Sequence, residues 1–109
     1  MSDLPATHLV EIFLPTGPND GEPFGRELFD RVRDELLEKF GGVTLFSRSP
    51  AEGLWTEGAA QGATRDRMIT VEVMTEAIDP AWWAEYRGEL QERFCQEEIL
   101  IRSYRISRL

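Results

Sequence analysis

The chain has few of the residues on which disulfide scaffolds and metal clusters depend. It holds one cysteine, Cys95, and one histidine, His8, among 109 residues. A single thiol excludes an internal disulfide, and this composition also excludes a Cys/His zinc finger. We expect Cys95 to be a buried, inert thiol beside Phe94. We expect His8 to be a solvated residue near a strand start, the alternatives being a proton shuttle or a haem ligand.

Long apolar runs and a basic balance are also missing. No apolar run approaches the ~20 residues that span a bilayer, and residues 1–5 lack the basic and apolar regions of a signal peptide. We therefore expect a cytoplasmic protein with no membrane partner. Twelve Lys and Arg residues stand against 20 Asp and Glu residues, for a formal charge of −8. This balance argues against nucleic acid as a partner.

What the chain does contain is ordinary for a globular protein. Apolar residues make up 41% and charged residues 29% of the sequence, which excludes general disorder. The length suits one core and is too short for two. We predict a single domain over residues 1–109, with a mobile loop at 57–66.

Residue patterns predict four strands and two helices. The strands are expected at 8–14, 43–48, 67–75 and 98–107. The first helix is expected at 24–40, ended by Gly41-Gly42, with an apolar stripe of Phe24, Leu28, Val32, Leu36 and Phe40, widened by Phe29 and Leu37. The second helix starts with Asp79 as N-cap and Pro80 at its first position. Its apolar stripe consists of Trp83, Tyr86, Leu90 and Phe94.

This β-α-β-β-α-β order is the ferredoxin-like arrangement of the α+β class. Right-handed crossovers place both helices on one face of a four-stranded antiparallel sheet, with the first and third strands in its centre. The aliphatic side chains of those strands should lie under the helices, namely Val10, Ile12, Leu14, Ile69, Val71 and Val73. The opposite, open face should carry Glu11, Phe13, Thr44, Phe46, Met68, Thr70, Glu72 and Met74. If Ile99 and Ile101 face the helices, the open face also gains Leu100, Arg102 and Tyr104.

An apolar patch on an uncovered sheet face indicates an interface or a ligand site. A second copy of the chain, packed face to face, is the simplest cover. The dimer-interface candidates are Phe13, Phe46, Met68 and Met74. The ligand-binding candidates are Glu11, Phe13, Phe46, Trp55, Glu72, Arg102 and Tyr104.

The pattern as a whole resembles the dimeric α/β-barrel group of ferredoxin-like proteins. Two segments, Gly41 to Trp55 and Asp79 to Arg87, are similar to those of an uncharacterised family of small bacterial proteins. The resemblance covers about His8 to Leu109. It implies a fold and a bacterial setting, but it assigns no catalytic residues. The barrel group includes cofactor-independent monooxygenases, haem proteins and members with only a binding or structural role.

Glu11 and Glu72 are the most informative polar residues, because each interrupts an apolar strand on the open face. Two nearby carboxylates can serve as acid and base. Alternatively, they pair with Arg102 or another arginine across the sheet or the dimer. Trp55 covers a cavity, stacks on a flat ligand or anchors its loop.

The first hypothesis is therefore a homodimeric binding or structural module. The alternative is a small cofactor-independent enzyme, oxygenase- or isomerase-like, with a cavity on the sheet face that takes a small molecule. Neither requires a cofactor or a metal.

Overall fold

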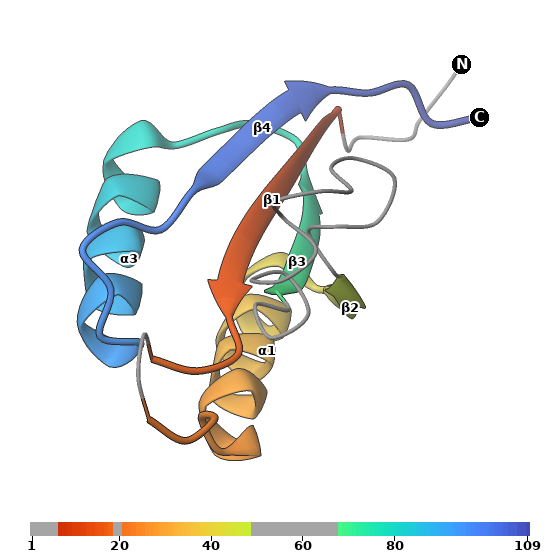
Figure 1. Ribbon diagram of the computed structural model, residues 1–109. Coiled ribbons are helices and arrows are strands. Elements are labelled where there is room, and N and C mark those ends of the chain that lie inside the picture. Colours follow the sequence, from red (N-terminus) through yellow and green to blue (C-terminus); the bar gives the residue numbers. More distant parts are fainter. Residues whose placement is uncertain (1–6, 19–20, 49–67) are drawn as a thin grey trace, which may run out of the picture.

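Four antiparallel strands form one sheet with the order β2-β3-β1-β4. The computed structural model describes residues 7–18, 21–48 and 68–109 (Figure 1). The strands are β1 (His8–Pro15), β2 (Thr44–Arg48), β3 (Met68–Thr75) and β4 (Ile101–Arg105). With β1 and β3 in the centre, the protein has the predicted α+β ferredoxin-like fold. Trp55 and the predicted loop at 57–66 lie outside the described residues.

The predicted capping residues mark the end of the first helix and the start of the second. Helix α1 (Arg26–Phe40) is closed by Gly41, whose φ of 85° lies in the left-handed region and whose N–H donates to the Leu37 carbonyl. Helix α3 (Pro80–Arg93) starts after Asp79, whose side chain accepts a hydrogen bond from the Trp82 N–H. Glycine tolerates the left-handed conformation, and an aspartate cap satisfies a free amide of the first turn. Neither helix is long and apolar enough to cross a bilayer, within the part of the chain that the structure describes.

The core lies between the helices and one face of the sheet. Both helices cover the same side of the strands (Figure 1). Val10, Ile12 and Leu14 of β1 are buried there, as are Val71 and Val73 of β3. Each residue of β1 lies opposite a residue of β3 on the same face, so alternation along one strand extends to the other. The fully buried Phe94, just after α3, contacts the rings of Phe24 and Phe29 from the α1 side.

Two sequence expectations about single residues are wrong. Leu37 does not widen the apolar stripe of α1, because its side chain is 46% exposed. Cys95 is exposed rather than buried. Phe94 takes the buried position at the end of α3, and the chain then turns at Cys95, whose φ is 55°. This turn directs the thiol away from the core.

The last strand is shorter than predicted. The sequence pattern favoured 98–107, whereas β4 spans Ile101–Arg105. Ile99 is buried and Leu100 is 57% exposed, and the Leu100 carbonyl accepts a hydrogen bond from the Phe13 N–H. Side chains therefore already alternate between the two faces of the sheet at Ile99 and Leu100, before β4 begins. This alternation places Leu100, Arg102 and Tyr104 on the open face, which was one of two possibilities from sequence.

Candidate functional site

The open face of the sheet carries a row of polar residues across its centre. Glu11 of β1 lies opposite Glu72 of β3 and Arg102 of β4, and Glu72 lies opposite Thr44 of β2. Neighbouring strands are about 4.8 Å apart. From β2 to β4, the row consists of Thr44, Glu72, Glu11 and Arg102, each one strand spacing from the next. The two carboxylates singled out in the sequence are direct cross-strand neighbours.

Glu11 is the buried centre of this row. Its residue exposure is 6%. Its Oε1 accepts a 2.8 Å hydrogen bond from Nε of Arg102, and its Oε2 accepts a 3.3 Å bond from the Tyr104 hydroxyl. The guanidinium of Arg102 also lies 5.0 Å from the centre of the Phe13 ring. A buried carboxylate needs such partners to offset its desolvation, and the ion pair expected between Glu11 and Arg102 is present.

Glu72 differs from Glu11 in having no such partner. Within residues 7–18, 21–48 and 68–109, its carboxylate makes no ion pair and accepts no hydrogen bond. Its negative charge nevertheless acts on Tyr104, which lies on the same face. Partial desolvation, then the charge and hydrogen bond of Glu11, then the charge of Glu72 raise the pKa of the Tyr104 hydroxyl. Tyr104 therefore stays protonated and acts as a donor at neutral pH.

Thr70 is the second buried polar residue on this face. It has no exposed surface, and no group of the described residues forms a hydrogen bond with its Oγ1. Its cross-strand neighbours are Phe13 on one side and Phe46 on the other. A buried hydroxyl without a partner costs about 1–3 kcal/mol. The sequence pattern placed Thr70 on the open face but gave no sign of its burial.

Apolar side chains with large exposed surfaces lie around the polar row. Met74 is 47% exposed, Leu100 57%, Tyr104 46% and Phe46 37%. All four point to the face that the helices leave uncovered. Of the other interface candidates, Met68 is half-buried at the start of β3, and Phe13 is half-buried under Arg102. The open face therefore combines a charged centre with an apolar surround.

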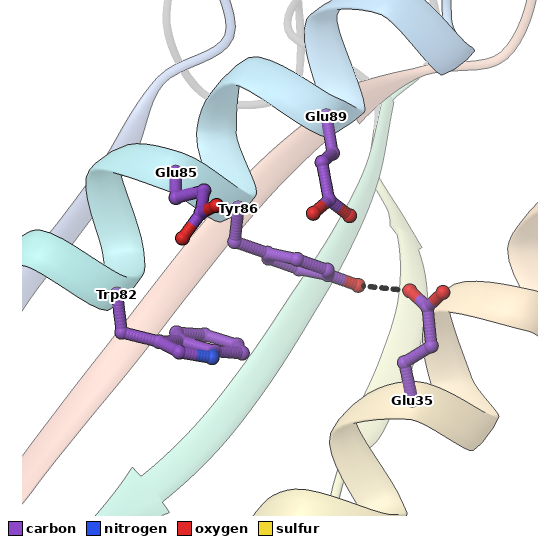
Figure 2. A pocket seen from close by; sticks show the side chains of 5 residues that line it. All are labelled: Glu35, Trp82, Glu85, Tyr86 and Glu89. Carbon is purple, nitrogen blue, oxygen red and sulfur yellow. Dashed lines mark hydrogen bonds between the residues drawn. The ribbon is translucent and has the colours of Figure 1, made fainter.

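A different polar cluster, not predicted from the sequence, joins the two helices. Glu35 of α1 accepts two hydrogen bonds from the guanidinium of Arg93, at 3.0 and 3.1 Å, and one of 2.8 Å from the Tyr86 hydroxyl. Figure 2 shows the Tyr86 hydroxyl directed from α3 to Glu35, with the Trp82 ring beside it. The Trp82 and Tyr86 rings are stacked, with centres 4.9 Å apart. A groove of about 190 Å³ is lined by Glu35, Trp82, Glu85, Tyr86 and Glu89.

The hydrogen bonds and charges of this cluster stabilise the ionised form of Glu35 and the protonated form of Tyr86. Burial alone would raise the pKa of Glu35, but hydrogen bonds from Arg93 and Tyr86 and the charges of Arg93 and Arg31 outweigh it and lower the pKa. Burial and the Glu35 carboxylate raise the pKa of Tyr86. The only sequence signal was the i,i+4 spacing of Arg31 and Glu35. The partners on α3 become neighbours only once the two helices pack side by side.

Two wider grooves flank the sheet. One, of about 510 Å³, lies beside the exposed Met74 and includes Lys39 and the aromatic side chains of Phe40, Trp82 and Trp83. Lys39 lies 4.7 Å from the centre of the Trp82 ring, a cation–π contact that occupies this face of the indole. The other, of about 480 Å³, includes Phe46 and Arg33. Both grooves therefore reach an apolar residue of the open face.

His8, a further residue singled out in the sequence, lies at the start of β1. Its Nδ1 is 3.0 Å from the Thr7 hydroxyl oxygen.

No group of three or more His, Cys, Asp and Glu residues is arranged to hold a metal ion in the described segments. No protein-family model and no curated protein matches the chain.

Proposed function

We propose that the protein is a homodimeric binding or structural module that associates through the open face of its sheet. The observation that carries this proposal is the gathering of exposed Phe46, Met74, Leu100 and Tyr104 side chains on one face. Large apolar side chains exposed together around a polar centre are characteristic of interaction sites. Packing two such faces together completes a sheet-on-sheet layer, about 10 Å thick, of the kind that stabilises sandwich folds.

The state of Glu11 favours a binding role over catalysis by this residue. Both of its carboxylate oxygens already accept hydrogen bonds, one from Arg102 and one from Tyr104. A substrate that used Glu11 as a base would have to displace at least one of these donors. The same contacts order the long Arg102 and Tyr104 side chains before association, which lowers the entropy lost when an interface forms.

One observation favours the enzyme hypothesis, in which a small molecule lies between the two sheets. The Thr70 hydroxyl is buried without a partner, and Glu72 lies on the same face without an ion pair among the described residues. A polar ligand that bonded to both would satisfy them. Native mass spectrometry tests this alternative: added mass on the wild-type dimer that is lost in Thr70→Val supports it, and a dimer of unmodified mass in both proteins contradicts it.

Sedimentation equilibrium over a concentration series tests the dimer itself. Met74→Glu introduces a charge at a site that is 47% exposed in one chain, so the monomer fold tolerates it. Leu37→Glu is a matched control, since Leu37 is 46% exposed but lies on α1, away from the open face. We expect wild type and Leu37→Glu to be dimers and Met74→Glu to be a monomer. A monomeric wild type, or equal association of the two variants, would contradict the proposal.

A further inference from the structure

The charged row on the open face is asymmetric about its central strand. Glu72 lies one strand to one side of Glu11 and Arg102 lies one strand to the other. Glu72 has no ion pair among the described residues. Arg102 donates to Glu11 through its Nε, and among the described residues its two terminal nitrogens, each with N–H groups, have no other hydrogen-bond or ion-pair partner. Within the described segments, the face thus carries one anion without an ion pair and one cation with unused donor groups, separated by two strand spacings.

Two symmetric ways of stacking the faces treat these charges differently. A two-fold axis that runs parallel to β1 above Glu11 exchanges the two sides of the row, so that Glu72 faces Arg102 of the partner subunit, and the reverse. A two-fold axis that runs along the row leaves each residue above its own copy. Glu72 then faces Glu72 of the partner subunit, and arginine faces arginine. Both arrangements are closed, isologous dimers, but only the first pairs opposite charges.

The apolar residues one pair further along the strands favour the same axis. Leu9 lies opposite Met74 of β3 and Tyr104 of β4. An axis parallel to β1 places Met74 against Tyr104 of the partner subunit, and thioether–aromatic contacts of this kind are favourable. An axis along the charged row brings Met74 instead against the buried Thr70 of the partner subunit. Charge and side-chain type therefore agree on one axis.

We propose that the second copy binds with its β1 parallel to β1 of the first, and that Glu72 and Arg102 form two reciprocal ion pairs across the interface. This inference rests on the proposed dimer and specifies its geometry. The two sheets, about 10 Å apart, lie within the combined reach of a glutamate and an arginine side chain. In aligned packing, two stacked sheets are rotated by about 30° relative to each other. Because Glu72 and Arg102 lie one strand from the two-fold axis, this rotation displaces them only slightly and leaves them opposite each other.

Glu72→Gln tests the geometry by the sign of its effect. With reciprocal ion pairs, the variant loses two interactions at once, and the dimer dissociation constant should rise roughly tenfold. With like charges facing each other, the same variant removes a repulsion, and the dissociation constant should fall. Glu38→Gln, a change of the same chemistry on the exposed surface of α1, is the control and should leave it unchanged.

A charge exchange provides the second arm of the experiment. Glu72→Arg places arginine against arginine in the proposed dimer and should raise the dissociation constant by roughly a hundredfold. Combining it with Arg102→Glu restores opposite charges across the interface and keeps an arginine beside Glu11. The double variant should return to within about threefold of wild type. Circular dichroism confirms that each variant folds.

The outcomes separate this inference from the proposal beneath it. A wild type that dimerises, combined with a Glu72→Gln variant whose affinity is unchanged or higher, overturns the reciprocal pairing and leaves the dimer standing. Failure of the charge exchange to restore association in a folded double variant has the same meaning. A wild type that sediments as a monomer overturns both. Addition of NaCl should weaken the wild-type dimer more than Glu72→Gln, because salt screens charge pairs.

Discussion

The ion pair between the two helices permits a quantitative test of what holds α3 against α1. The Arg93 side chain is only 8% exposed, and it donates two hydrogen bonds to Glu35, whose side chain is 34% exposed. Exposed ion pairs contribute about 0–1 kcal/mol, and breaking a buried pair costs about 3–5 kcal/mol. Since one partner is buried and the other partly exposed, Arg93→Met should cost about 2 kcal/mol. In a domain of this size, that lowers the melting temperature by about 10 °C.

The assay is a double-mutant cycle measured by urea unfolding. The variants are Arg93→Met, Glu35→Gln and their combination; the amide of Glu35→Gln keeps an acceptor for the Tyr86 hydroxyl. We expect a coupling energy of about 1–2 kcal/mol. The internal reference is the Arg26–Asp30 pair of α1, whose side chains are 85% and 39% exposed with atoms 3.7 Å apart. Its coupling should be about 0.3 kcal/mol. Equal coupling in the two cycles would refute the reasoning, because burial would then have no effect.

Three other predictions concern stability. Thr70→Val replaces an unpartnered buried hydroxyl with a methyl group of similar size and should raise the free energy of unfolding by about 1 kcal/mol; a loss in urea titration would mean that the hydroxyl has a partner. Because the folded-state pKa of Glu35 is lowered, its stabilisation is complete above the unfolded pKa of about 4.3 and is lost as pH falls below it. Between about pH 5 and about pH 3, wild type should thus lose more stability than Glu35→Gln, and parallel curves would exclude this contribution. Asp79→Ala removes the cap of α3 and should cost about 1 kcal/mol in the same titration, against no change if the cap is idle.

Strand alternation predicted the faces of the sheet because its period is fixed by backbone geometry. Val10 and Glu11 must point to opposite faces, whatever the rest of the fold does. The fold then aligns β1 with β3, so Glu11 and Glu72 become neighbours without any further information. The same reasoning located Arg102, once the phase of β4 was known. These contacts follow from periodicity and topology, which a single sequence contains.

What the sequence did not reveal depends on how elements pack. Leu37 fits the helical period of the apolar stripe, but it is exposed, whereas Val32 and Leu36 of the same helix are buried. The Glu35–Arg93 contact depends on where α1 and α3 lie side by side. Thr70 is fully buried although alternation places it on the open face between Phe13 and Phe46. Each of these features depends on contacts between residues that are far apart in the sequence, and a local residue pattern does not predict such contacts.

The most direct test of the central claim is the rate at which Met74 is oxidised by dilute hydrogen peroxide, read by peptide mass spectrometry. Methionine converts to its sulfoxide according to its access to the reagent, and Met74 is 47% exposed in a single chain. If a second copy covers the open face, Met74 should be protected at high protein concentration and become reactive on dilution. Oxidation of Met74 at one fast rate over the whole concentration range would show that the face is uncovered, and would contradict the account.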